Sequence, residues 1–157
     1  SLIDHSLATK LLEGAAVFCS GLVSGATFYV TTLENPGRAS KPVKYQLENW
    51  HVTFPRAAGF LKPFGMFVNV ILGTCIYSTG KKAWYVPMGL FFLMGPFTVL
   101  AITPTNDKLL ALDVDREDDV KKAGPLVDSW APLHNVRTVI SGLGFIGAIV
   151  AMAMDNK

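Results

Sequence analysis

Four long runs of uncharged, mainly apolar residues dominate the chain. They cover residues 14–33, 63–80, 83–106 and 138–154 and are 20, 18, 24 and 17 residues long. A helix needs roughly 20 mainly apolar residues to cross the ~30 Å hydrocarbon core of a bilayer. The pattern therefore predicts four transmembrane helices, over about 8–33, 56–79, 83–104 and 130–154.

A soluble helical bundle with an apolar core is the alternative interpretation. Each helix of such a bundle has a polar face, whereas "AWYVPMGLFFLMGPFTVLAIT" (83–103) has none. Only 17% of the residues are charged, against about 25% in a typical soluble domain. We therefore expect an all-α integral membrane four-helix bundle that forms a single domain over residues 1–157.

The short segments between the runs predict where the helices end. "ENPGR" (34–38) should end the first span, because Asn-Pro-Gly favours a turn, and residues 38–56 should then form a polar loop. "STGKK" (78–82) is short, so the second and third spans should be antiparallel neighbours. Pro87 and Pro96 should kink the third span, because each removes a helix hydrogen bond.

The longest connection is 104–128. Asp115 can cap a short helix that stops at Gly124-Pro125, and the leucines before it are apolar enough for the membrane surface. We expect a short amphipathic helix in this connection, and a solvated acidic loop over 113–119.

The fourth span should begin at Asp128 or Ser129, which are good cap residues, with Pro132 in its first turn. Trp130 to Met154 is 25 residues, or about 37 Å of helix. That length exceeds the ~30 Å core, so the first turns of this span should lie at a membrane interface.

The basic residues favour one orientation. The two long connections hold nine Lys and Arg and the other side holds four, so the positive-inside rule places the long connections in the cytoplasm or an equivalent compartment. The N-terminal stretch has mixed polarity and no cleavage site after a short apolar core, so we expect the first span to be retained. The predicted location is an integral, multi-pass one, with endomembrane and mitochondrial inner membrane both open.

Several kinds of chemistry have no support in the sequence. The formal net charge is +2 without any basic run, so nucleic acid is not an expected partner. Cys19 and Cys75 lie inside apolar runs and are expected to be buried free thiols. No zinc, haem, phosphate-loop or nucleophile-elbow spacing is present, so neither a metal nor a cofactor is predicted.

Small and polar residues inside the spans predict helix contacts. Gly21 and Gly25 are four residues apart, which lets helix backbones approach closely within this chain or against other membrane subunits. Asn69 is a lone polar residue in the second span. We expect it to hydrogen-bond to another span, a contact of about 1 kcal/mol.

A candidate site lies where the third span ends and the fourth begins. Trp130, His134 and Arg137 are four and three residues apart, so a helix places them on one face. Thr105 and Asn106 lie at the end of the third span. His134 suits proton transfer near neutral pH, Arg137 suits an oxyanion, and Asn106 can donate or accept a hydrogen bond. Trp130 can stack on a flat ring, so the group suits a lipophilic, weakly acidic, planar substrate delivered from the bilayer.

Each of these residues also has an ordinary structural explanation. Trp130 can be an interfacial anchor, and Arg137 can extend to a lipid phosphate. His134 can bridge nearby carbonyl groups. From the residues alone, both readings stay open.

Two stretches carry a family resemblance. "GPFTVLAITPTNDKLLAL" (95–112) and "LVDSWAPLHNVRTVISGLGFIGA" (126–148) resemble the anthrone oxygenase-like family of small four-span membrane proteins, largely a family of unknown function. The pattern is Pro-Phe-Thr in the third span, Thr-Asn-x-x-Leu after it, and Trp-x-x-x-His-x-x-Arg opening the fourth. The glycine-rich first span and "ENWHVTFPRAAGFLKP" (48–63) fit the same layout, whereas the acidic stretch 113–119 does not match the enzymes.

The resemblance implies an oxygenase. Certain fungal members oxidise anthrones to anthraquinones with molecular oxygen, and a route without a cofactor is chemically plausible. In that hypothesis His134 is the base, Arg137 and Asn106 hold the oxyanion, and Trp130 and Thr105 contribute to substrate binding. The alternatives are a non-catalytic accessory subunit of a larger membrane complex, such as a respiratory one, and a carrier for a lipophilic small molecule.

Overall fold

The computed structural model describes the backbone of residues 2–154 and the side chains of residues 6–154, and the described backbone is almost entirely helical. Helix α1 (Leu2–Tyr29) continues through a π-helical turn, η1 (Val30–Glu34), into α2 (Asn35–Ala39). Helix α3 (Val43–Thr79) follows, then a 3-10 turn, η2 (Lys82–Trp84), and α4 (Tyr85–Phe97). A second π-helical turn, η3 (Thr98–Ile102), leads into α5 (Thr103–Leu110), and α6 (Glu117–Ala153) completes the bundle.

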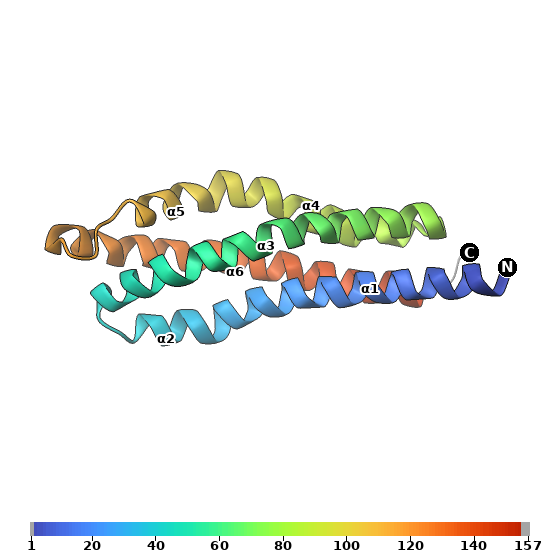
Figure 1. Ribbon diagram of the computed structural model, residues 1–157, viewed down its shortest axis with the longest axis horizontal. Helices are drawn as coiled ribbons and strands as arrows, with labels where there is room; N and C mark the ends of the chain where they lie inside the picture. The colour runs from blue at the N-terminus through green and yellow to red at the C-terminus, as the bar shows by residue number, and fades with distance from the viewer. Residues whose placement is uncertain (1, 155–157) are drawn as a thin grey trace.

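These elements form an elongated bundle of four helical rods (Figure 1). Each rod is long and apolar enough to cross a membrane: Ser6–Ala39, Val43–Thr79, Lys82–Leu110 and Glu117–Ala153. The beginning of α1 and the end of α6 lie at one end of the bundle, and the α2–α3 and α5–α6 connections lie at the other (Figure 1). The expectation of an all-α, four-span membrane fold is confirmed.

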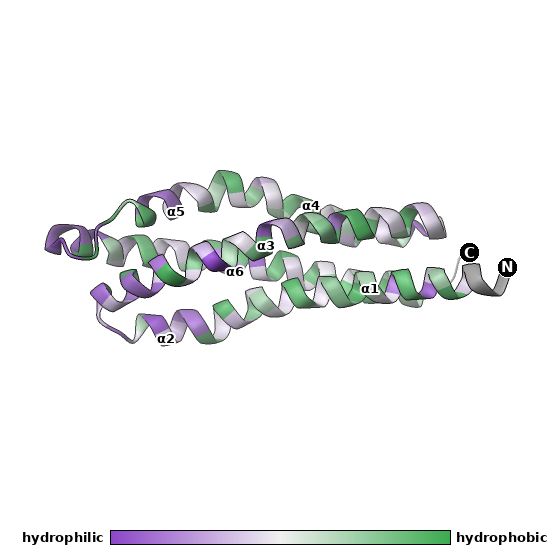
Figure 2. Cartoon of the chain, in the orientation of Figure 1, coloured by the Kyte–Doolittle hydropathy of each residue, from purple (hydrophilic) through white to green (hydrophobic). Residues whose placement is uncertain are grey.

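Polar residues gather at the connection end of the bundle, whereas apolar residues prevail along its middle (Figure 2). Large exposed apolar side chains on α6 begin at Val136 and continue to Met152. Such a surface is typical of helices that face lipid rather than water. The stretch Trp130–Arg137 therefore lies at the edge of the apolar zone, as its distance from the end of the helix predicts.

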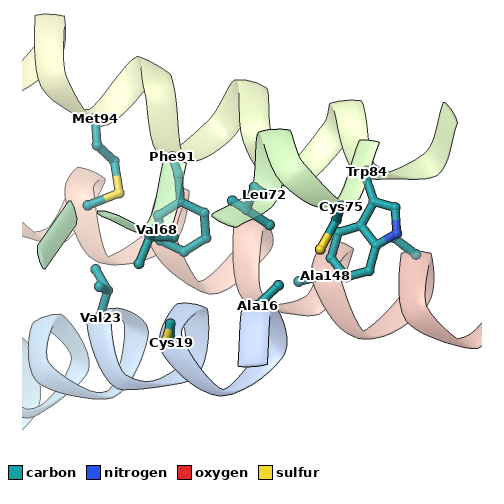
Figure 3. Close-up of a cluster of buried hydrophobic side chains, with 11 residues drawn as sticks. Ala16, Cys19, Val23, Val68, Leu72, Cys75, Trp84, Phe91, Met94 and Ala148 are labelled. Carbon is teal, nitrogen blue, oxygen red and sulfur yellow. The ribbon is translucent and has the colours of Figure 1, made fainter. Parts of the chain in front are cut away.

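Two clusters of buried apolar residues fill the interior. The terminal cluster joins all four rods and contains Ala16, Cys19, Val23, Val68, Leu72, Cys75, Trp84, Phe91, Met94, Ala148 and Ala151 (Figure 3). The connection cluster contains Leu47, Trp50, Ile102, Leu109, Ala123, Val127 and Trp130. Cys19 and Cys75 are buried free thiols, as expected.

A buried ion pair ties the α3–α4 connection to α1. Lys81 Nζ lies 2.8 Å from the Glu13 carboxylate, and the Trp84 indole N–H donates to the same oxygen at 3.3 Å. Gly80 makes the sharp turn after α3 possible, because its φ of 67° lies in the left-handed region that glycine adopts at little cost. The tight antiparallel connection of the second and third rods is confirmed.

The first helical rod is longer than predicted. Asn-Pro-Gly does not end it, because the helix passes through the π-helical turn η1, which ends two residues before Pro36, and continues as α2. The rod ends at Ala39.

The predicted polar loop over 38–56 is also wrong for most of its length, because α3 begins at Val43. Gln46, Leu47 and Trp50 are buried at three- and four-residue intervals, so this stretch has the periodicity of a packed helix. The polar residues between them made it resemble a loop. The connection itself is reduced to residues 40–42.

The fourth rod begins earlier than predicted. Helix α6 starts at Glu117, and it continues through Gly124-Pro125, where we expected a stop. Asp128 and Ser129 are therefore not caps, and Pro132 lies inside the helix rather than in its first turn. Pro125 and Pro132 are both exposed, so their rings face outward and the packed side of the helix continues past them.

The short helix that we expected to begin at Asp115 and to stop at Gly124-Pro125 is not a separate helix, because residues 117–125 are the first turns of α6, whereas α5 continues the third rod to Leu110. Residues 111–116 form the connection between α5 and α6, so the loop expected over 113–119 is correct only as far as residue 116. Pro96 precedes the π-helical turn η3, in line with the local distortion expected there. Pro87 is instead the third residue of α4, where it removes no helix bond.

Candidate functional site

A cavity of about 700 Å³ lies between α3 on one side and α4, η3 and α5 on the other. Members of both core clusters contribute to its walls, and most of the lining is apolar. Its volume is within the roughly 300–1,000 Å³ typical of small-molecule sites. The polar and charged lining residues are Glu34, Arg38, Thr53, Lys62, Asn69, Thr98, Thr103, Asn106, His134 and Arg137.

The face predicted on the fourth span is part of this cavity. Trp130, His134 and Arg137 all line it. The Trp130 and His134 rings stack with their centroids 4.7 Å apart and 29° between their planes. This parallel arrangement of an indole and an imidazole leaves a flat surface beside the arginine.

Asn106 is held against the same face by a buried hydrogen bond. The Trp130 indole N–H donates to Asn106 Oδ1 at 2.9 Å. An indole nitrogen only donates, so the oxygen of the amide must face Trp130 and its NH₂ group is directed elsewhere. Asn106 also lines the cavity, so a donor is available there.

Thr105 is half-buried on α5 and is not among the residues that line the cavity. Thr103, two residues earlier, is among them, and its hydroxyl donates to the carbonyl oxygen of Thr98 at 3.1 Å. The structure therefore brings together four of the five predicted site residues.

Two threonines determine which ring nitrogen of His134 carries the proton. Thr31 Oγ1 lies 3.1 Å from His134 Nδ1 and 2.7 Å from Thr138 Oγ1. The Thr138 hydroxyl lies 3.1 Å from the carbonyl oxygen of Thr27 and 3.2 Å from that of His134, and these carbonyls can only accept.

The arrangement that satisfies every contact follows from this count of donors. Thr138 donates to a carbonyl, Thr31 donates to Thr138, and Thr31 can then only accept from an Nδ1–H of His134. This assignment rests on the partners of each group. A neutral His134 in this form carries its lone pair on Nε2, on a ring that lines the cavity.

Arg137 has no hydrogen bond or ion pair with any residue in the described part of the chain, and its buried Nε lacks a partner. It lies at the edge of the apolar zone and lines the cavity. An arginine within a membrane helix is normally paired with a carboxylate, a carbonyl or water. The guanidinium is therefore available to an anionic group in the cavity.

The structure adds two residues to the candidate site, Arg38 and Trp50, which both line the cavity and which the sequence did not indicate as site residues. Arg38 is only 5% exposed, forms an ion pair with Glu34, and lies over the Trp50 ring at 5.4 Å. Trp50 in turn packs edge-on against Trp130, with centroids 4.7 Å apart. The four-residue spacing of Glu34 and Arg38 is a helix-pair signal, but it applies only because the helix continues past Glu34 through α2.

Asn69 does not bond to another helix, contrary to expectation. Its amide N–H donates to the Gly65 carbonyl of its own helix at 3.0 Å, and its Oδ1 is buried without a partner. The reason is the cavity itself, which separates this part of α3 from α4.

Among the described side chains, no three His, Cys, Asp or Glu residues are grouped closely enough to hold a metal ion. The polar groups of the cavity are instead one imidazole, one carboxylate, three cationic side chains, and hydroxyl and amide groups. This set can bind an anionic oxygen and accept a proton.

Four apolar rods around a ligand-sized cavity with a polar end define a helical membrane protein with an internal cavity. The Anthrone oxygenase family matches residues 50–147. The chain belongs to this family. The match includes Asn106, Trp130, His134 and Arg137, and it leaves Arg38 outside. No curated protein and no solved structure matches the chain.

Proposed function

We propose that this protein is a membrane oxygenase that converts a lipophilic polyketide anthrone to the anthraquinone with molecular oxygen. The observation that carries the proposal is the pairing of His134 with an unpartnered Arg137 at one cavity, beside the Trp130 ring. A base next to a cation suits a substrate that loses a proton and leaves negative charge on an oxygen.

Substrate binding rests on the apolar walls and the aromatic residues. Most of the cavity lining is apolar, and the Trp130 ring offers a face for a flat, fused-ring ligand. The cavity also has exposed apolar lining residues on both α3 and α4, among them Met66 and Phe92. A hydrophobic substrate can therefore enter sideways from the bilayer.

Proton removal is assigned to His134 Nε2. The Thr31 hydroxyl holds the Nδ1–H at 3.1 Å, so the lone pair of the ring stays on the nitrogen that serves as base. The proton comes from the CH₂ group of the central anthrone ring. The resulting anthrolate carries its charge on the oxygen attached to the central ring, where Arg137 and the Asn106 NH₂ group stabilise it.

The oxidation of the anthrolate by O₂ then needs no electron donor other than the substrate itself. The anthrolate gives electrons to O₂ and forms a peroxide on the central carbon, and protonated His134 returns its proton to this peroxide to give the hydroperoxide. Loss of water from this hydroperoxide gives the second carbonyl group. One atom of O₂ ends in the quinone and the other in water, and the oxidant is O₂ itself. No cofactor takes part in this route.

The test is oxygen uptake by the purified chain in nanodiscs with anthrone as substrate, corrected for uptake without protein. We expect His134→Ala to lower the rate about 10²- to 10⁴-fold, the usual contribution of a general base. Asn135→Ala is the matched control, because Asn135 is the exposed neighbour on the same helix. Equal uptake by folded His134→Ala and the wild-type protein would refute the assignment of His134 as the base.

A further inference from the structure

Arg38 is a buried cation with unused donors. It lines the cavity, and only its Nη2 is engaged, by the carboxylate of Glu34. Its Nε and Nη1 are buried and have no hydrogen-bond partner among the residues that the structure describes. A guanidinium carries five N–H donors, and buried donors are nearly always satisfied by protein, water or ligand. These two nitrogens therefore need a hydrogen-bond acceptor that the described residues do not supply.

The surroundings of Arg38 connect it to the proposed reaction centre through a series of rings. Its guanidinium lies 5.4 Å from the centre of the Trp50 ring, Trp50 packs edge-on against Trp130, and Trp130 stacks on His134. Arg137 lines the same cavity from α6. Two guanidinium groups thus line the cavity that these rings border.

The charge of the cavity favours an anionic ligand. Its lining contains three cationic side chains, Arg38, Lys62 and Arg137, and one carboxylate, Glu34. Since Glu34 is paired with Arg38, the excess is positive. Next to apolar walls an unbalanced positive charge attracts an anion more strongly than it does in bulk water.

We propose that Arg38 binds an ionised group of the ligand other than the reacting oxygen, so that the preferred substrate class is a planar aromatic acid. Arg137 binds the reacting oxygen beside His134. Arg38 binds a carboxylate or a second phenolate on the Trp50 side of the cavity. This inference rests on the proposed function for the identity of the reacting ring, but its test requires no turnover.

The experiment compares two non-reacting probes of nearly equal shape, anthracenecarboxylate and anthracenemethanol, with the substituent on the middle ring. The full chain is placed in nanodiscs of zwitterionic lipid, and binding is followed by quenching of tryptophan fluorescence, since Trp50 and Trp130 line the cavity. We expect the wild-type protein to bind the carboxylate about tenfold more tightly than the alcohol, in keeping with one charge-assisted contact.

The Arg38→Gln variant should lose most of this preference and keep its affinity for the alcohol within about twofold. Arg56→Gln is the control, because Arg56 is an exposed arginine on α3 that does not line the cavity. If Arg38→Gln does not fold, the double variant Glu34→Gln with Arg38→Gln removes the same cation without leaving the Glu34 carboxylate unpaired, and it should lose the preference in the same way. A wild-type protein without preference for the acid, or a variant that retains the preference, overturns the inference.

A lipid phosphate is the other possible source of the anion. If the preference for the acid is lost when anionic lipid is added to the wild-type nanodiscs, the Arg38 nitrogens belong to a headgroup and the substrate inference fails. If the preference persists, it stands. The oxygen-uptake test is independent of these results, because a chain that binds the acid but consumes no oxygen contradicts only the proposed reaction.

Discussion

The Thr31 hydroxyl is not part of the cavity wall, yet it holds the Nδ1 side of the His134 ring. It can do so because Thr138, one helical turn after His134, accepts the Thr31 proton. Thr31 belongs to α1's π-helical extension and Thr138 to α6, so the contact joins two helices. His134 is thereby fixed by two hydroxyl groups that lie outside the cavity lining.

This arrangement predicts the effect of removing one hydroxyl. Thr31→Val keeps the shape of the side chain but removes the acceptor for Nδ1–H, so anthrone-dependent oxygen uptake should fall about tenfold or more. Thr31→Ser, which keeps a hydroxyl, should retain most of the activity. Nitrogen NMR of labelled histidine should show the proton of His134 on Nδ1 in the wild-type protein and mixed tautomers in the valine variant.

Thr32→Val provides the control for that experiment. Thr32 is exposed, and its hydroxyl donates to the Phe28 carbonyl of its own helix at 2.7 Å. This variant makes the same chemical change one residue away and should leave both uptake and the NMR signal unchanged. If it lowers uptake as much as Thr31→Val does, the role assigned to Thr31 is wrong.

The Trp130–Asn106 hydrogen bond predicts a stability effect. Trp130→Phe removes the only donor to the buried Asn106 oxygen among the described residues, and an unsatisfied buried acceptor costs about 1–3 kcal/mol. The thermal midpoint in detergent should fall accordingly. The double variant Trp130→Phe with Asn106→Leu should recover part of that loss, because no polar atom is left unpaired, and strictly additive losses would argue against the bond.

At the scale of helices, α6 is the element that the others pack against, and Gly144 marks a tight contact between α6 and α4. A Cβ added at Gly144 would lie 2.8 Å from the Phe91 ring of α4. Phe91 is buried in the terminal cluster, so its ring has little room to move (Figure 3). The contact depends on the absence of a side chain at this position.

Gly144→Ala should therefore destabilise the protein by about 1–3 kcal/mol through overpacking. At Gly142 the nearest atom to an added Cβ is the Ser24 hydroxyl oxygen, 3.9 Å away, which is ordinary contact. Gly142→Ala is the matched control and should leave the thermal midpoint unchanged or raise it, since alanine favours helix. Phe91→Leu should relieve the clash in the Gly144→Ala background.

The number and order of the helices followed from the sequence, whereas several of their ends did not. Uncharged runs of the required length define a span because a charge inside lipid is costly. Proline and glycine define an end less reliably. Pro36 follows a π-helical turn, and Pro125 and Pro132 face outward, so none of them interrupts a packed face.

The candidate site was predictable where it lies on one helix and unpredictable where helices meet. Trp130, His134 and Arg137 share a face by spacing alone. Arg38 depends on the unexpected continuation of α1 through α2, and Thr31 depends on where α1 crosses α6. Gly21 likewise proved to face Phe145 of the same chain, while Gly25 has open space beside it.

As a whole, the bundle is longer than a bilayer is thick. A helix of 37 residues, such as α3 or α6, spans about 55 Å, whereas the hydrocarbon core is ~30 Å thick. The polar connection end therefore projects from the membrane (Figure 2). Both cysteines lie deep in the terminal cluster.

This geometry predicts a labelling pattern in sealed vesicles. Ser40→Cys and Asp115→Cys should react with an impermeant maleimide from the same side, and Lys82→Cys from the opposite side, because their connections lie at opposite ends of the bundle (Figure 1). The native cysteines should react only after denaturation. Labelling of all three introduced cysteines from one side would contradict the four-span arrangement.

The open surface beside Gly25 allows a test of whether this protein binds another membrane subunit. If its open surface binds another membrane subunit, the protein should co-purify with a larger complex in mild detergent, and Gly25→Leu should release it. Gly89→Leu is the control, since Gly89 is exposed on α4 and also has open space beside it. A single species of the chain's own size before and after substitution would exclude a stable accessory-subunit role.

The two π-helical turns border the cavity, with Val30 and Glu34 in one and Thr98, Val99 and Ile102 in the other. A π-helical turn is equivalent to one extra residue inserted into an α-helix. Deleting Leu100 would thus restore a regular helix, but it would turn every later residue by about 100° and shift it by about 1.5 Å. Asn106 would then point away from Trp130. The third rod would become a regular helix, but Asn106 would no longer contact Trp130. The one extra residue of η3 therefore sets which way the later side chains of this rod face.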